Sequence, residues 1–117
     1  MTFEVNPIRT HRRTKGDTRT PLKIVIVDEN EAAVNLSGLT LKFKMVRAAG
    51  TDKVAETASN VTVTDAANGE VQYDFQAADV DEAGEFFAWF IIEDGSSEKD
   101  HVPHDGRRLR VQIYNAA

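Results

Sequence analysis

The stretch Leu39-Thr40-Leu41-Lys42-Phe43-Lys44-Met45 alternates apolar and polar side chains at every step. Successive side chains of a β-strand point to opposite faces, so this period of two predicts a strand with one face in the core and one in water. The same alternation recurs in residues 71–75 and 109–113. The dominant pattern of the chain is therefore that of half-buried strands rather than amphipathic helices.

About seven short strands are expected, at residues 3–5, 22–27, 39–45, 61–63, 71–75, 86–92 and 109–113. Turn-forming residues such as Asn68-Gly69 separate them. Residues 22–27 are continuously apolar after Lys23, which predicts a central strand covered on both faces. One or two helical turns are expected within residues 76–83. The pattern predicts an all-β fold, an antiparallel sandwich of the immunoglobulin type.

The length of 117 residues predicts a single domain, residues 1–117. Hydrophobic residues make up 41% and charged residues 28% of the chain, as in ordinary folded proteins. The longest apolar run, residues 86–92, is far shorter than the roughly 20 residues that span a bilayer. There is no cysteine, which excludes disulfides and thiolate chemistry.

Charge is distributed unevenly along the chain. Residues 1–23 carry six cations and two acids, a balance of +4, whereas residues 65–105 carry twelve acids and one lysine, a balance of −11. Residues 9–20 are expected to form a basic arm or long loop. It is either a solvated connection or a segment ordered by a neighbouring subunit. In the second case the cations of the arm would dock on an acidic face of that subunit. The cations concerned are Arg9, Arg12, Arg13 and Lys15.

The aromatic stretch 86–92 is the second candidate for a binding surface. If the even-numbered residues face the core, then Phe87, Trp89 and Ile91 face the opposite way. Three large apolar groups on an outer sheet face predict an interface with another protein. The alternative is that a loop or the basic arm of the same subunit covers them.

No residue pattern predicts catalysis, a cofactor or a metal site. The pair His101 and His104 lies in a loop without a fixed third ligand, so exposed histidines are the expected state. Asp79, Asp81 and Glu82 do not follow EF-hand spacing and are expected to form a solvated turn. The serines show no nucleophile pattern, so we do not expect an enzyme. The cations lack interleaved aromatic residues, so nucleic-acid binding is not expected either.

The order of several motifs resembles a known family. Residues 16–18, an apolar strand ending at 27–30, and residues 34–38 precede the alternating strand. Asn68-Gly69-Glu70-Val71-Gln72-Tyr73, residues 81–86 and residues 102–111 follow in the same order. This series resembles the immunoglobulin-like N-terminal domain of phage baseplate upper proteins and related tail proteins. Phe86 stands where many immunoglobulin-like domains have a corner tyrosine, so packing is expected to hold that corner.

The resemblance implies a non-enzymatic structural subunit of a bacteriophage virion, in the tail tip, baseplate or fibre-attachment region. The implied partners are other phage structural proteins, with a homo-oligomer in the particle and no membrane. Assembly in the cytoplasm of the host bacterium would suit a chain without cysteines or a visible secretion signal. A head decoration protein, a neck protein and a carbohydrate-binding module remain alternatives at this stage.

Overall fold

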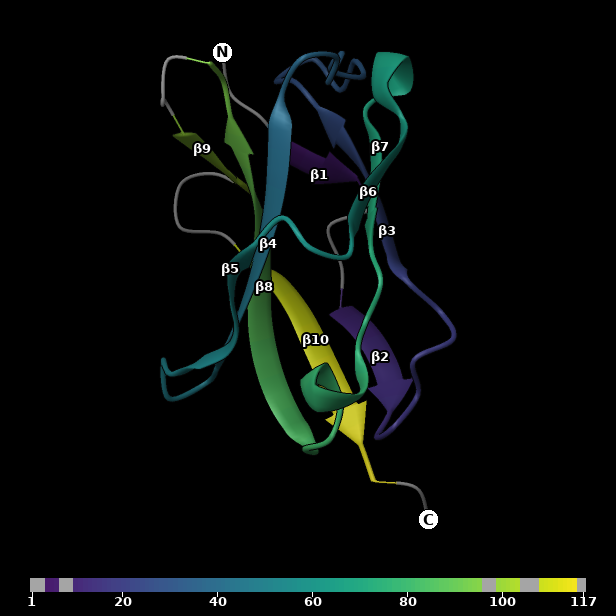
Figure 1. Ribbon diagram of the computed structural model, residues 1–117, viewed down its shortest axis with the longest axis vertical. Coiled ribbons are helices and arrows are strands. Elements are labelled where there is room, and N and C mark those ends of the chain that lie inside the picture. The colour runs from purple at the N-terminus through teal and green to yellow at the C-terminus, as the bar shows by residue number, and fades with distance from the viewer. Residues whose placement is uncertain (1–3, 7–9, 96–98, 104–107, 116–117) are drawn as a thin grey trace.

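The alternating segments of the sequence form two facing β-sheets in the computed structural model (Figure 1). The structure describes residues 4–6, 10–95, 99–103 and 108–115. The first sheet is four-stranded. Its strands lie in the order β1 (Glu4–Asn6), β3 (Leu22–Val27), β7 (Glu70–Tyr73) and β6 (Val61–Asp65).

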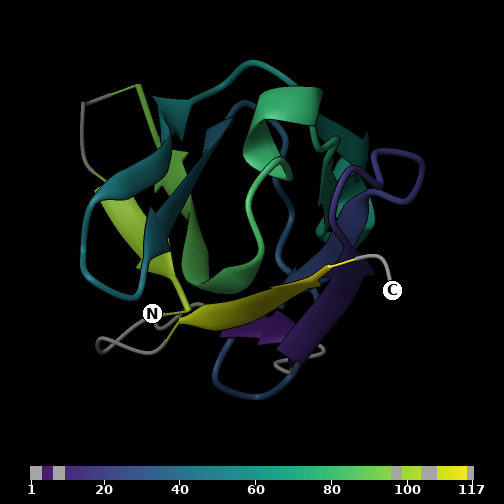
Figure 2. The same cartoon turned by 90° about the horizontal axis from the view of Figure 1, so that it is seen from below.

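The second sheet is six-stranded and is centred on β8 (Gly84–Glu93). One side of β8 pairs with β4 (Thr40–Arg47), which in turn pairs with β5 (Asp52–Thr57). The other side is shared by β10 (Leu109–Tyr114), which pairs with residues 84–88, and β9 (Lys99–Val102), which pairs with residues 90–93. Strand β2 (Thr10–Thr14) runs parallel to β10, and Figure 2 shows the two side by side.

The predicted β-sandwich is confirmed, and the structure adds detail that the sequence pattern did not indicate. Each predicted strand segment is present, whereas β2, β5 and β9 were not predicted. Strand β3 is central, but Lys23 is exposed and Val25 half-buried, so the prediction that both faces are covered is wrong. Within residues 76–83 only the 3-10 turn η2 (Ala77–Asp79) forms. None of the described helices is long and apolar enough to cross a membrane.

An aromatic cluster joins the two sheets at the centre of the core. Phe43 of β4 stacks on Tyr73 of β7, with ring centroids 4.0 Å apart. Phe90 and Phe75 meet the same Phe43 ring edge-on at 5.2 and 6.3 Å. Each of these rings buries a large apolar area, and edge-on geometry is favoured by the ring quadrupoles. This cluster therefore fixes how the two sheets face each other.

A short turn, η1 (Ala66–Asn68), ends at a glycine that no other residue could replace without strain. Gly69 has φ of +71°, and a Cβ there would lie 2.5 Å from the carbonyl oxygen of Ile26. The close approach lets the Ile26 amide donate to the Gly69 carbonyl at 2.8 Å. The glycine of the Asn68-Gly69 turn therefore allows the backbones of β3 and β7 to approach closely.

Tyr73 makes a buried hydrogen bond that ties β7 to the next turn. Its hydroxyl donates to Asp79 Oδ2 at 2.6 Å, and the Gln76 amide donates to the same oxygen at 2.8 Å. Burial, then this hydrogen bond and the charge of Asp79, raise the pKa of Tyr73 above its usual value. The phenol therefore keeps its proton in the folded state at pH values at which an unfolded tyrosine ionises.

We expect Tyr73→Phe to lower the free energy of unfolding by about 1–3 kcal/mol at neutral pH, because a buried hydrogen bond to a carboxylate is lost. The raised pKa also means that the wild type loses stability as pH rises above about 10, where the unfolded chain releases the proton. The variant lacks this linkage, so the difference between the two proteins should shrink at high pH. Urea melts between pH 7 and 11 measure it, and a constant difference would contradict the proposed linkage.

Candidate protein interface

The outer side of β8 carries aromatic residues for which the sequence pattern predicts a protein interface. Phe86, Ala88, Phe90 and Ile92 lie in the core, which agrees with the predicted strand register. Phe87 and Trp89 are half-buried on the opposite side. Ile91 is 0% exposed and therefore already covered within the chain. It cannot contact a partner in this fold, so the aromatic surface reduces to Phe87 and Trp89.

Cationic side chains flank both outer rings. The Arg108 guanidinium lies 4.2 Å from the centre of the Phe87 ring, and Lys44 Nζ lies 5.9 Å from that of Trp89. Cations over aromatic faces are attracted by the ring quadrupole, which holds these long side chains over the sheet. The Trp89 Nε1 group is buried, and no described residue accepts its hydrogen. The surface is thus a mixed aromatic and cationic one.

The basic arm contributes a strand to the same sheet. Residues 10–14 form β2, so neighbouring side chains point to opposite sides, and Arg12 is exposed while Arg13 is buried. The Arg13 guanidinium lies 3.9 Å from the centre of the Phe75 ring in the core. The prediction that Arg13 docks on a neighbouring subunit therefore conflicts with its burial. Lys15 is exposed, and Arg9 lies outside the described residues.

Arg13 holds the loop that follows β2. Its Nη1 donates to the carbonyl of Asp17 at 2.5 Å, and its Nη2 donates to the carbonyl of Thr20. Nη2 also contacts His11 Nε2 at 3.0 Å. Burial lowers the pKa of Arg13, and the charge of Asp17 opposes that shift. The guanidinium stays charged at neutral pH even so, because an arginine side chain does not lose its proton in that range.

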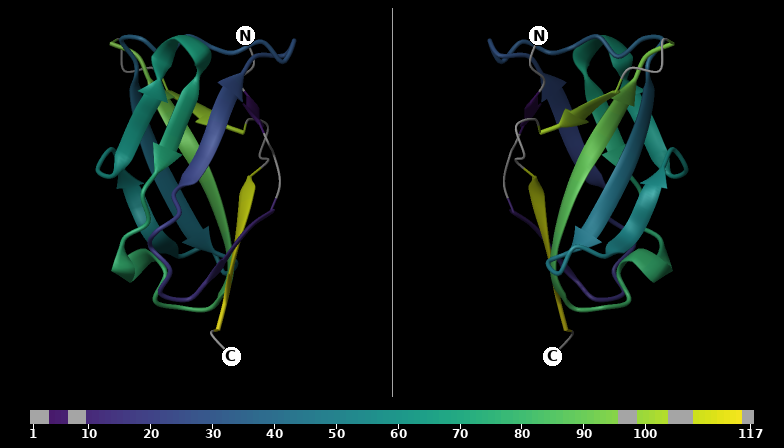
Figure 3. Two further views of the ribbon diagram at one scale, coloured as in Figure 1. Left: turned by 90° about the vertical axis from the view of Figure 1, so that its right-hand side faces the viewer. Right: turned by 90° about the vertical axis from the view of Figure 1, so that its left-hand side faces the viewer.

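The strand register brings the two sequence candidates together on one face. Arg12 of β2 pairs with Gln112 of β10, which pairs in turn with Glu85 of β8. Thr10 of β2 pairs with Arg110 of β10, which pairs in turn with Phe87 of β8. Paired residues on adjacent strands share a face. The right-hand view of Figure 3 shows this sheet. We call the surface the aromatic-cationic face, and its members are Arg12, Lys44, Phe87, Trp89, Arg108, Arg110 and Tyr114.

Tyr114 is a member that the sequence reasoning missed. It is 49% exposed and pairs with Thr14 at the end of β10, two residues beyond Gln112. Its hydroxyl donates to Gln112 Oε1 at 2.6 Å. The alternation of Leu109, Val111 and Ile113 with polar residues would have placed Tyr114 outward, had it been continued one residue further.

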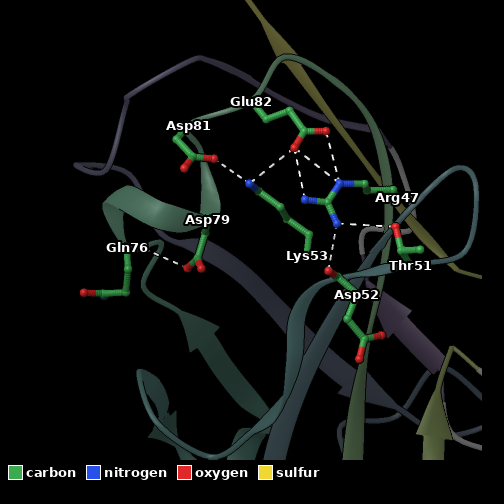
Figure 4. Close-up of polar contacts among 8 residues, drawn as sticks. All are labelled: Arg47, Thr51, Asp52, Lys53, Gln76, Asp79, Asp81 and Glu82. Atoms are coloured by element: carbon green, nitrogen blue, oxygen red, sulfur yellow. Dashed lines mark hydrogen bonds and ion pairs between the residues drawn. The ribbon is translucent and has the colours of Figure 1, made fainter.

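The acidic turn before β8 is neutralised by cations of the β4–β5 hairpin (Figure 4). Lys53 Nζ lies 2.5 Å from Asp81 Oδ1, and Arg47 Nη2 donates to Glu82 Oε1 at 3.1 Å. These hydrogen bonds hold the pKa of both carboxyls below the usual range. Asp79 points inward and caps η2. Asp81 and Glu82 thus have cationic partners within the chain, and the expected solvated turn is wrong for Asp79, which is buried.

Among the described residues, no group of three histidines or acids is placed to hold a metal. His101 is exposed on β9, with its ring centre 6.4 Å from that of Trp89. His104 lies outside the described residues. His101 is thus exposed as expected, although it lies on a strand rather than in a loop.

The fold and this face define a β-sandwich domain with a mixed aromatic and cationic sheet surface. The family model described as the BppU N-terminal domain matches residues 2–104, and the chain belongs to that family. The family is a phage baseplate structural domain, a class that is generally non-enzymatic. The chain is thus a virion component that interacts with other phage structural proteins. The resemblance read from the sequence is confirmed.

A comparison with solved structures finds one that is similar to the chain in fold. The chain is similar to CopC from Methylosinus trichosporium OB3b, with a TM-score of 0.57, 9% identity, and coverage of 97% of this chain and 92% of that one. It also matches the Lin-41 filamin domain (TM-score 0.44, 14% identity, 95% and 90% covered) and murine CRIg (0.42, 10%, 100% and 100%). No curated protein matches the sequence. Identities this low concern the fold alone.

Two adjacent arginines allow a matched test of these roles. We expect Arg13→Ala to lower the free energy of unfolding by about 2–3 kcal/mol, because two carbonyl contacts and the cation-π contact are lost together. Arg12→Ala should change it by less than about 0.5 kcal/mol, as at other exposed positions. Urea melts of both variants measure the difference. Equal effects would show that β2 does not have the described register.

Proposed function

We propose that this chain is a non-enzymatic structural subunit at the tail tip or fibre-attachment region of a phage baseplate. It acts by protein-protein assembly through the aromatic-cationic face, forms a homo-oligomer in the particle and is assembled in the host cytoplasm. The convergence of Arg12 with Phe87 on one sheet face carries this proposal, since the two positions are far apart in the sequence. Aromatic residues and arginine are the groups most enriched in protein interfaces.

The same face is a poorer match for a sugar or for nucleic acid. Lys44 lies over the Trp89 ring, and that ring is half-buried, so no open aromatic platform is offered for stacking a sugar. Nucleic-acid binding depends on many cations that contact phosphates. Here Arg110 and Lys44 already contact carboxylates within the chain, at 3.5 Å in both cases, and the net charge is −5. A protein partner is therefore the proposal that we retain.

The test uses Trp89→Ala, with Val25→Ala as a matched control because Val25 is half-buried on the outer side of the other sheet. We expect Trp89→Ala to weaken self-association by about 2 kcal/mol or more, as for a central interface aromatic. Val25→Ala should leave association unchanged. Sedimentation of the purified chain measures association, and urea melts confirm that both variants are folded at the assay temperature.

Salt gives a second readout of the same proposal. Contacts made by Arg12 and Arg108 should weaken as the Debye length falls from about 10 Å at 0.1 M to about 3 Å at 1 M salt. The aromatic part of the contact should persist. Association that is indifferent to both Trp89→Ala and salt would rule out this face as the interface.

A further inference from the structure

Strand β6 forms one edge of the four-stranded sheet. It pairs with β7 on one side, and none of the strands that the structure describes pairs with its other side. The left-hand view of Figure 3 shows this sheet, in which β6 lies at the opposite edge from β1. An edge strand presents amide and carbonyl groups to which a further strand can bond. The open side of β6 is therefore a candidate site for strand addition.

The register shows which backbone groups of β6 point to the open side. The Asp74 amide donates to the Asn60 carbonyl at 2.9 Å, just before the β6–β7 pair begins. Residues of an antiparallel ladder alternate between those that bond to one neighbouring strand and those that face the other side. Thr62 therefore bonds toward β7, whereas the amide and carbonyl groups of Val61 and Val63 point to the open side.

The side chains of β6 alternate between the two faces of the sheet. Val61 and Val63 are half-buried and pack against the core, whereas Thr62 and Thr64 are exposed on the outer face. The two valines thus keep apolar area that the fold of one chain leaves in contact with water. A further strand beside β6 would cover part of that area, which favours its addition.

The other edges of the two sheets carry features that discourage strand addition. Strand β1 has only three residues, β2 carries Arg12 and Arg13, and β5 has register shifts and the ion-paired Lys53. Short edges, charges and bulges are the usual protections of an exposed edge. Strand β6 contains no lysine, arginine or proline, and its one register shift follows Val63. Residues 61–63 are therefore a regular and unprotected edge.

We propose that β6 pairs antiparallel with β6 of a second copy, with Thr62 opposite Thr62 on a two-fold axis. In this register the Val63 amide donates to the Val61 carbonyl of the second copy, and the reverse bond forms by symmetry. The Val61 amide, which lies 3.3 Å from the Ala58 carbonyl in the single chain, turns to the Val63 carbonyl of the second copy. The four strands of each copy then form one continuous sheet across the contact.

A second copy fits this edge because the contact is self-complementary about the two-fold axis. Thr62 meets its own counterpart and Val61 meets Val63, and both are favourable cross-strand pairs. Asp65, the one charged residue of β6, lies near Ser59 of the second copy rather than near another acid. The contact is small, so it stabilises copies that an assembled particle already holds close together. It involves the other sheet from the aromatic-cationic face and therefore does not rest on the proposed function.

Disulfide trapping tests this contact, because the chain has no cysteine of its own. Opposite residues in a non-hydrogen-bonded antiparallel pair have Cα atoms about 4.5 Å apart, which is within disulfide range. Thr62→Cys should therefore form disulfide-linked dimers under mild oxidation about tenfold faster than a control. The matched control is Thr64→Cys, exposed on the same side of β6, since its two copies would lie about 14 Å apart. Non-reducing gel electrophoresis measures both rates.

Val63→Pro tests the backbone bonds of the contact. Proline lacks the amide that bonds to the second copy, and because this amide points away from β7, the variant should keep its own sheet. In a chain that also carries Thr62→Cys, we expect the crosslinking rate to fall to that of the control. Val63→Ala in the same background keeps the amide and should slow crosslinking less. Urea melts verify that each variant is folded at the assay temperature.

The outcomes also separate this inference from the proposed function. Equal crosslinking of Thr62→Cys and Thr64→Cys, or crosslinking of neither, would overturn the β6 pairing. Because Trp89 lies on the other sheet, Thr62→Cys should crosslink as fast with Trp89→Ala as without it. A loss of crosslinking with Trp89→Ala would show that the thiols meet through the aromatic-cationic face and would reject β6 as a contact in its own right. Crosslinking that persists while Trp89→Ala leaves sedimentation unchanged would support the β6 contact and contradict the proposed face.

Discussion

The stack of Phe43 on Tyr73, with ring centroids 4.0 Å apart, is the contact on which the rest of the structure depends. It joins the inner strand β4 of one sheet to β7 of the other, and Phe75 meets both rings edge-on. Two rings of the cluster also contact polar residues at the edge of the core. The Tyr73 hydroxyl donates a hydrogen bond to Asp79, and the Arg13 guanidinium packs over the Phe75 ring. The core therefore fixes a turn and a strand besides packing the sheets.

The contact between Arg13 and Phe75 also determines the register of β2. Because Arg13 points inward to Phe75, strand alternation places Arg12 outward beside Gln112. A slip of one residue would exchange the two arginines, burying one cation away from its carbonyl partners and exposing the other. A contact in the core thus decides which of the two arginines is exposed on the sheet surface. The proposed interface therefore depends on the register of a single edge strand.

The resulting surface combines two kinds of interaction that act at different distances. In the proposed interface, exposed arginines would attract a partner of opposite charge over about a Debye length and favour its orientation. Phe87 and Trp89 supply apolar area that becomes effective only at contact. If the face is the interface that we propose, steering would speed encounter while the aromatic contact would slow dissociation. None of this requires a reactive group, in agreement with a structural family.

The sequence by itself determined the β-sandwich and its predicted strands, because strand alternation is a local signal. The same alternation determined that Phe86, Ala88 and Phe90 face the core. It also identified the family from the order of its turns. Strands β2, β5 and β9 became visible only in the tertiary structure, since their side chains alternate weakly and pairing partners define them. Burial of Arg13 and Ile91 was likewise decided by packing. The placement of Arg12 and Phe87 on one sheet face depends on register across β10, a long-range property that no local pattern encodes.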